Sequence, residues 1–144
     1  MEHLALPVDA QRGPNCGLTA LAVVAGVTLA EATAEYIRVY PRYVGSNWKG
    51  GTRWDYTTQA AENLGVRYVD DTPLDPRYLI RIVKRMSLKT FVKKYALPGK
   101  RYIIRTTGHV QVVQDSMVID QGGVCHIDEY RGAGKIVKNA LRIV

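Results

Sequence analysis

The sequence predicts an α+β domain, with helices in the first part of the chain and an antiparallel sheet in the last part. Two observations support this prediction. Apolar residues recur at helical spacing up to about residue 97, and from about residue 98 they alternate with polar residues, as in half-buried strands. The length of 144 residues fits a single domain, 1–144, with a helical half at about 1–97 and a sheet half at about 98–144.

The composition is that of a globular protein, with 47% hydrophobic and 23% charged residues. No apolar run approaches the ~20 residues of a membrane helix, and the start of the chain lacks the pattern of a secretory signal. Its two cysteines, Cys16 and Cys125, make neither a disulfide framework nor a four-ligand zinc site. We therefore expect a cytoplasmic protein, in the host cytoplasm if it is viral, with no metal, no other cofactor and no membrane partner.

The first helix, expected over residues 16–25, is apolar on nearly every side and should be covered all round. Asn15 is a good N-cap residue, and Gly26 ends the helix. Cys16 then stands at a helix N-terminus, whose partial positive charge favours a thiolate. Gln11 lies a short loop upstream, where its side-chain amide can donate a hydrogen bond to a developing oxyanion.

Two amphipathic helices are expected next. Thr28 and Glu31 form a capping box for a helix that closes near residue 41, and Thr52 with Asp55 indicates a second capping box for a helix that stops near residue 65. The loop between them carries Trp48 beside glycines. A surface loop is the commoner role of such a stretch, and lining a substrate cleft is the alternative.

A short strand over residues 66–69 precedes a strongly basic region. Asp75 followed by Pro76 predicts a basic helix to about residue 86, and Ser87 predicts the cap of another helix. No acidic residue occurs between Pro76 and Gln114. Half of the basic residues of the chain fall in this region: Arg77, Arg81, Lys84, Arg85, Lys89, Lys93, Lys94, Lys100, Arg101 and Arg105. The commoner role of such a region, over residues 76–105, is a solvated pair of helices whose charge keeps the protein soluble. The alternative is a surface for acidic partners; nucleic acid is a less favoured one, because no arginine-aromatic motif accompanies the charge.

Alternating residues predict strands over 101–106, 109–113, 117–119, 124–127 and 136–144. If Asp115-Ser116 is a two-residue turn, Gln114 pairs with Met117, and residues 109, 111, 113, 118 and 120 share one face. His109 and Asp120 are then diagonal neighbours, roughly 7–8 Å apart. A slip of one residue would move Asp120 to the other face.

His109 is therefore the best candidate for the base that a thiolate nucleophile needs, with Asp120 as its orienting partner. His3 lies in an N-terminal arm, and His126 follows Cys125 on a strand, where adjacent side chains point to opposite faces. Asp115 lies at the far end of the strand, and Asp128 is a weaker substitute for Asp120. The alternative is a structural hydrogen bond in a half-buried sheet.

In this layout the chain resembles the papain-like cysteine peptidases, above all their compact members: bacteriocin-processing peptidase domains and small phage and bacterial proteins. The motifs are Cys16-Gly17 at the start of a buried helix, Gln11 upstream, Gly108-His109 opening a late strand and Asp120 closing the next. Gln11 precedes Cys16 by five positions, one fewer than is usual in the family. In papain itself a tryptophan shields the acid and histidine, and none follows Asp120 here.

The resemblance implies Cys16 as nucleophile, His109 as general base and acid, Asp120 as orienter, and Gln11 with the Cys16 amide as oxyanion donors. Trp48 and Gly108 are candidates for substrate binding. The expected activity is that of a cysteine peptidase or isopeptidase on a protein or peptide substrate. The alternatives are a peptidoglycan amidase or endopeptidase of the CHAP or NlpC type, and an inactive papain-like module that binds nucleic acid or a protein through its basic surface.

Overall fold

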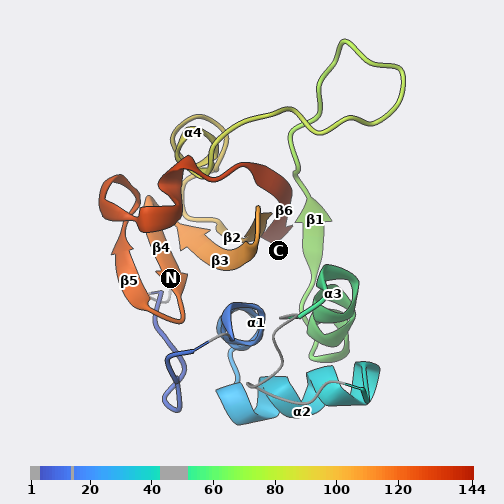
Figure 1. The fold of residues 1–144 in the computed structure, drawn as a ribbon, viewed down its shortest axis with the longest axis vertical. Coiled ribbons are helices and arrows are strands. Elements are labelled where there is room, and N and C mark those ends of the chain that lie inside the picture. The colour runs from blue at the N-terminus through green and yellow to red at the C-terminus, as the bar shows by residue number, and fades with distance from the viewer. Residues whose placement is uncertain (1–3, 14, 43–51) are drawn as a thin grey trace.

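The computed structural model describes residues 4–13, 15–42 and 52–144. A six-stranded antiparallel sheet, in the order β1-β6-β2-β3-β4-β5, has helices on both faces (Figure 1). The strands are β1 (Tyr68–Asp70), β2 (Arg101–Thr106), β3 (His109–Gln114), β4 (Met117–Asp120), β5 (Gly123–His126) and β6 (Val137–Ile143). The helices are α1 (Cys16–Ala25), α2 (Leu29–Val39), α3 (Trp54–Asn63) and α4 (Leu88–Lys94), with 3₁₀ turns η1 (Ile127–Glu129) and η2 (Arg131–Gly134). The expected α+β class is confirmed.

Helix α1 is covered on all sides, as its sequence predicts. One side packs Ala20 and Val23 on the sheet, and the other packs Leu21 against α2 and α3. The predicted capping box of α2 is present, since the Thr28 hydroxyl accepts from the Glu31 N–H and the Glu31 carboxylate accepts from the Thr28 N–H. Within the described ranges no single helix is long and apolar enough to cross a membrane; only α1 and α2 together, bent by 108°, meet that criterion.

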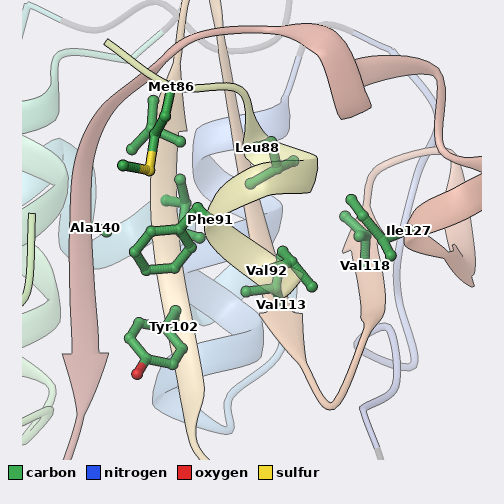
Figure 2. Close-up of a cluster of buried hydrophobic side chains, with 11 residues drawn as sticks. Met86, Leu88, Phe91, Val92, Tyr102, Val113, Val118, Ile127 and Ala140 are labelled. Carbon is green, nitrogen blue, oxygen red and sulfur yellow. The ribbon is translucent and has the colours of Figure 1, made fainter. Parts of the chain in front are cut away.

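Helix α4 covers the opposite face of the sheet. The hydroxyl of Ser87 accepts from the Thr90 N–H, which confirms the predicted cap. Figure 2 shows Phe91 and Val92 of α4 lying against the side chains of the sheet. Because both faces are covered, β2 and β3 are buried along most of their length; Arg105 is exposed, and Arg101 and His109 are partly exposed.

The β3–β4 hairpin has the predicted register. Asp115 and Ser116 have φ angles of 50° and 68°, a pair of left-handed residues that forms a tight two-residue turn. Gln114 pairs with Met117, and the pairing continues to Val112 with Ile119. This register carries residues 109 and 120 to the same end of the hairpin.

The prediction of a helix over residues 75–86 is wrong. This segment instead leaves the body of the protein as a projecting loop, drawn in yellow-green in Figure 1 and closed by an antiparallel bridge between Leu74 and Val83. The Asp75 carboxylate accepts from the N–H and guanidinium of Arg77, but the residues that follow are not helical. The β-branched residues over 80–83 favour extended backbone.

One other expectation needs correction. Thr52 does not cap α3, which begins after Arg53 without a side-chain cap, and Thr52 packs against Gly17 instead. Strand β1 comes from the first half of the chain but forms one edge of the sheet, beside β6, and α4 lies on the face opposite α1.

Candidate active site

Cys16 is the first residue of α1 and lies where this buried helix meets the start of β3. The N–H groups of Val110 and Gly17 donate hydrogen bonds to its sulfur. Asn15 occupies the N-cap position, but its side chain does not cap the helix. The buried Asn15 amide donates to the carbonyl of Gln11 and accepts from the Thr19 hydroxyl, so it holds the preceding loop onto the helix.

His109 and Asp120 meet, as the hairpin register predicts. The Nε2 atom of His109 lies 3.0 Å from Oδ2 of Asp120, and both side chains are largely buried, at 15% and 18% exposed. His109 also hydrogen-bonds Cys16. Because Asp120 occupies Nε2, the Nδ1 atom is the ring nitrogen left for the thiol. Cys16, His109 and Asp120 therefore form one hydrogen-bonded series.

The pKa values in this series favour a charged thiolate–imidazolium pair. Burial alone would raise the pKa of Cys16, but the hydrogen bond and charge of His109, with the two backbone N–H groups, lower it below its ordinary value. The Asp120 hydrogen bond, followed by the Cys16 hydrogen bond, raises the pKa of His109 to about 9. The imidazole is therefore protonated at neutral pH, and its positive charge favours ionisation of the Cys16 thiol.

Tyr130, in the short connection between η1 and η2, completes the surroundings of Asp120. Its hydroxyl donates to Oδ2 of Asp120 at 2.8 Å, and the Gly122 N–H donates to Oδ1 at 2.8 Å. Burial would raise the pKa of Asp120, but bonds from His109, Tyr130 and Gly122 lower it. Tyr130 was not predicted from the sequence, and its hydroxyl covers one oxygen of the acid.

Gln111 links Tyr130 to the sheet. It is fully buried in β3, its amide donates to the Ile104 carbonyl, and its Oε1 lies 3.4 Å from the hydroxyls of Tyr130 and Thr106. A buried glutamine between valines needs hydrogen-bond partners. This glutamine was therefore a signal in the sequence that other polar groups would lie beside it in the core.

We predict that Tyr130→Phe lowers peptide-cleaving activity about fivefold and the free energy of unfolding at pH 7 by about 1 kcal/mol, because Asp120 loses a donor. The lowered pKa of Asp120 contributes stability that is present above its ordinary value of 3.8 and is lost as pH falls through the folded value. The free energy of unfolding in urea should therefore differ less between pH 7 and pH 3 in the variant than in the wild type. Tyr78→Phe, in the exposed loop, is the control; an equal loss there would contradict the prediction.

The other predicted residues lie around this series without joining it. Gln11 is exposed, and its side chain makes no hydrogen bond to the described residues. Gly108 has a φ of 69° and forms the β2–β3 turn directly before His109. Trp48 falls outside the described residues. The roles of Gln11 and Gly108 stay predictions.

A cavity of about 790 Å³ opens beside His109 and Asp120. The loop at Arg12-Gly13 forms one wall, the β4–β5 turn another, and residues 129–132 with Lys135 a third. Cys125 lines it, but its pKa is raised by burial and then by the charges of Asp120 and Glu129. The two cysteines therefore differ in chemistry, because Cys16 is driven towards thiolate and Cys125 towards thiol.

His126 takes no part in the site. It is exposed, and its Nδ1 accepts from the Asp128 N–H at the start of η1. Asp128 pairs with Lys89 and Lys93 on α4, so it does not replace Asp120. In the part of the chain that the structure describes, no three histidine, cysteine or acidic side chains gather as metal ligands would.

Comparison of the chain with protein-family models, with curated proteins and with solved structures returned no significant match. The fold and the site define an α+β protein with a cysteine at a helix N-terminus, bonded to a histidine–aspartate pair at the end of a β-hairpin.

Proposed function

We propose that this chain is a papain-like cysteine peptidase or isopeptidase that hydrolyses an amide bond through Cys16, His109 and Asp120. The observation that carries the proposal is the series of hydrogen bonds from Cys16 through His109 to Asp120. A thiol beside an oriented imidazole is the arrangement that activates a sulfur nucleophile. Packing of α1 on an antiparallel sheet supports the same assignment. Cys16 is a free thiol, which suits a reducing cytoplasm.

The reaction begins when the Cys16 thiolate attacks the amide carbonyl and forms a C–S bond. The protonated His109 then gives its proton to the amide nitrogen, the C–N bond breaks, and the amine leaves. Water attacks the resulting thioester while His109 takes a proton from it, the C–S bond breaks, and the thiolate returns. Asp120 and Tyr130 keep the imidazole oriented throughout both steps.

The oxyanion formed in each step needs hydrogen-bond donors. The first N–H groups of a helix lack intrahelical partners, so the Cys16 N–H is directed outwards from α1. The Asn15 amide is buried and already bonded, so it is not free to act as this donor, and the resemblance to the family assigns the role to Gln11. Asn15 holds the Gln11 carbonyl at 3.1 Å, and this bond fixes the loop that must deliver the Gln11 amide.

Alkylation rates test the proposal, with Cys125 as the internal control in the same molecule. At pH 6 iodoacetamide should label Cys16 at least about tenfold faster than Cys125, because the thiolate is the reactive form. Mass spectrometry of quenched samples from pH 5 to pH 10 gives both rates. Cleavage of peptides should fall above about pH 9, as His109 loses the proton that it gives to the leaving amine. Equal, slow labelling of the two cysteines would overturn the proposal.

Digestion assays separate the peptidase from the amidase alternative. We expect Cys16-dependent cuts in protein or peptide mixtures and none in purified peptidoglycan; the reverse result would favour the amidase. The basic-surface alternative has less support, because Lys89 and Lys93 share Asp128 and Arg101 bonds Gln114. A salt-sensitive affinity for nucleic acid, without any hydrolysis, would favour it.

A further inference from the structure

The walls of the cavity beside His109 carry an excess of positive charge. Arg12, Arg131 and Lys135 all line it, from the loop before α1, from η2 and from the residue after η2. None of these three side chains has an ion pair or hydrogen bond with another residue in the described ranges. Some arginines elsewhere on the surface do pair with acids, as Arg142 does with Asp71 at 2.7 Å. Three unpaired cations around one cavity are therefore available to a ligand.

The acids of the cavity do not neutralise these cations. Asp120 is committed to His109 and Tyr130. Glu129 also lines the cavity, and its side chain has no ion pair with the described residues. Three cations face this one free carboxylate, so the walls attract an anion.

The lining of the cavity lets a peptide backbone approach closely. Glycines at 13, 122, 123 and 132 line it, and glycines let a ligand backbone approach closely. A Cβ at Gly132 would collide with the ring of Tyr130, so this glycine also keeps Tyr130 over Asp120. The volume of about 790 Å³ lies within the range of about 300–1,000 Å³ typical of ligand pockets.

The position of the cavity indicates which part of a substrate would enter it. Its lining includes His109 and Asp120, and Cys16 is not among the described residues that line it. His109 must protonate the leaving amine, so the leaving group lies on the histidine side of the thiol. The cavity therefore adjoins the residues that follow the cleaved bond.

We propose that this cavity binds acidic side chains of the substrate on the leaving-group side, through Arg12, Arg131 and Lys135. This inference rests on the proposed function, since it names the substrate class of that site. The enzyme would cut ahead of Asp or Glu residues in acidic segments of proteins.

A binding experiment tests the cavity apart from catalysis. The Cys16→Ala protein is titrated with C-terminally labelled peptides Gly-Glu-Glu-Gly and Gly-Gln-Gln-Gly, whose free amino ends resemble the released product. We expect the acidic peptide to bind about tenfold more tightly in fluorescence anisotropy, since two partly shielded ion pairs give roughly this factor. With Arg131→Gln and Lys135→Gln added to this protein, the ratio of the two peptide affinities should fall close to one.

Arg67→Gln with Lys94→Gln is the matched control, because it removes the same charges at positions that do not line the cavity. This pair should leave the ratio unchanged. Equal binding of both peptides to the Cys16→Ala protein, or equal losses in the two charge variants, would overturn the inference.

A cleavage experiment with the intact enzyme distinguishes failure of the inference about acidic substrates from failure of the proposed function. A peptide library made from a whole proteome is digested, and the residues after each Cys16-dependent cut are identified by mass spectrometry. Enrichment of Asp and Glu in the first few positions supports the inference. Cys16-dependent cuts without that enrichment overturn the inference alone, whereas absence of such cuts overturns the proposed function.

Discussion

His109→Ala should reduce peptide cleavage about a thousandfold, because one imidazole supplies both the proton transfers and the charge that stabilises the thiolate. In the variant Cys16 keeps its burial, which raises its pKa, and loses the two largest influences that lower it. Labelling of Cys16 at pH 6 should therefore slow to a rate similar to that of Cys125. Cleavage of a peptide pool and alkylation at pH 6 measure the two effects on one preparation.

His126→Ala is the matched control for this variant. It removes the same side chain from an exposed position where, among the described residues, the imidazole bonds the backbone and carboxylate of Asp128. Cleavage should stay within about twofold of the wild-type rate, as expected for a surface substitution. If His109→Ala kept a tenth or more of the activity and Cys16 still labelled rapidly at pH 6, His109 would have only a structural role.

The meeting of His109 and Asp120 was predictable because a tight turn determines which residues of a hairpin share a face. Asp115-Ser116 sets the pairing, and the period of two then carries it to the far end of the strands. The capping box at Thr28 and the cap at Ser87 were predictable for the same reason, since each depends on residues within four positions.

Tyr130 could not be predicted in this way, because it lies between two 3₁₀ turns that have no sequence periodicity. Its position over Asp120 depends on how the connection from β5 to β6 folds back onto the sheet, which is a tertiary property. The cavity was unpredictable for a related reason, since its walls come from segments more than a hundred residues apart in sequence.

The projecting loop shows how local signals can conflict. Asp75-Pro76 is typical of a helix start, and the Asp75 carboxylate does bond the Arg77 N–H as a helix cap would, but the chain does not continue as a helix. The Asp75 N–H then donates to the Ile82 carbonyl at 2.7 Å, which closes the loop. The helix signal is therefore overridden by β-branched residues that favour extended backbone.

Gly17→Ala should destabilise the protein by about 2 kcal/mol, although alanine ordinarily stabilises a helix relative to glycine. A Cβ at this position would overlap the Thr52 hydroxyl and lie 3.0 Å from Thr52 Cβ, and threonine is too short and branched to move aside. Because Gly17 follows Cys16 and donates its N–H to the sulfur, a shift of α1 also misplaces the thiol. Urea unfolding should show the loss in stability, and cleavage should fall in parallel.

The Thr52→Gly variant tests whether the overlap with the Thr52 side chain causes the loss of stability. With the threonine side chain removed, Gly17→Ala should cost much less than it does in the wild type, and the difference between the two costs measures the contact. Gly26→Ala serves as a comparison for backbone effects, because Gly26 has a φ of 67° and open space around its Cβ position. If Gly17→Ala were as stable as the wild type, α1 would have room to move. Close packing of Gly17 on Thr52 would then not be needed to hold Cys16 beside His109.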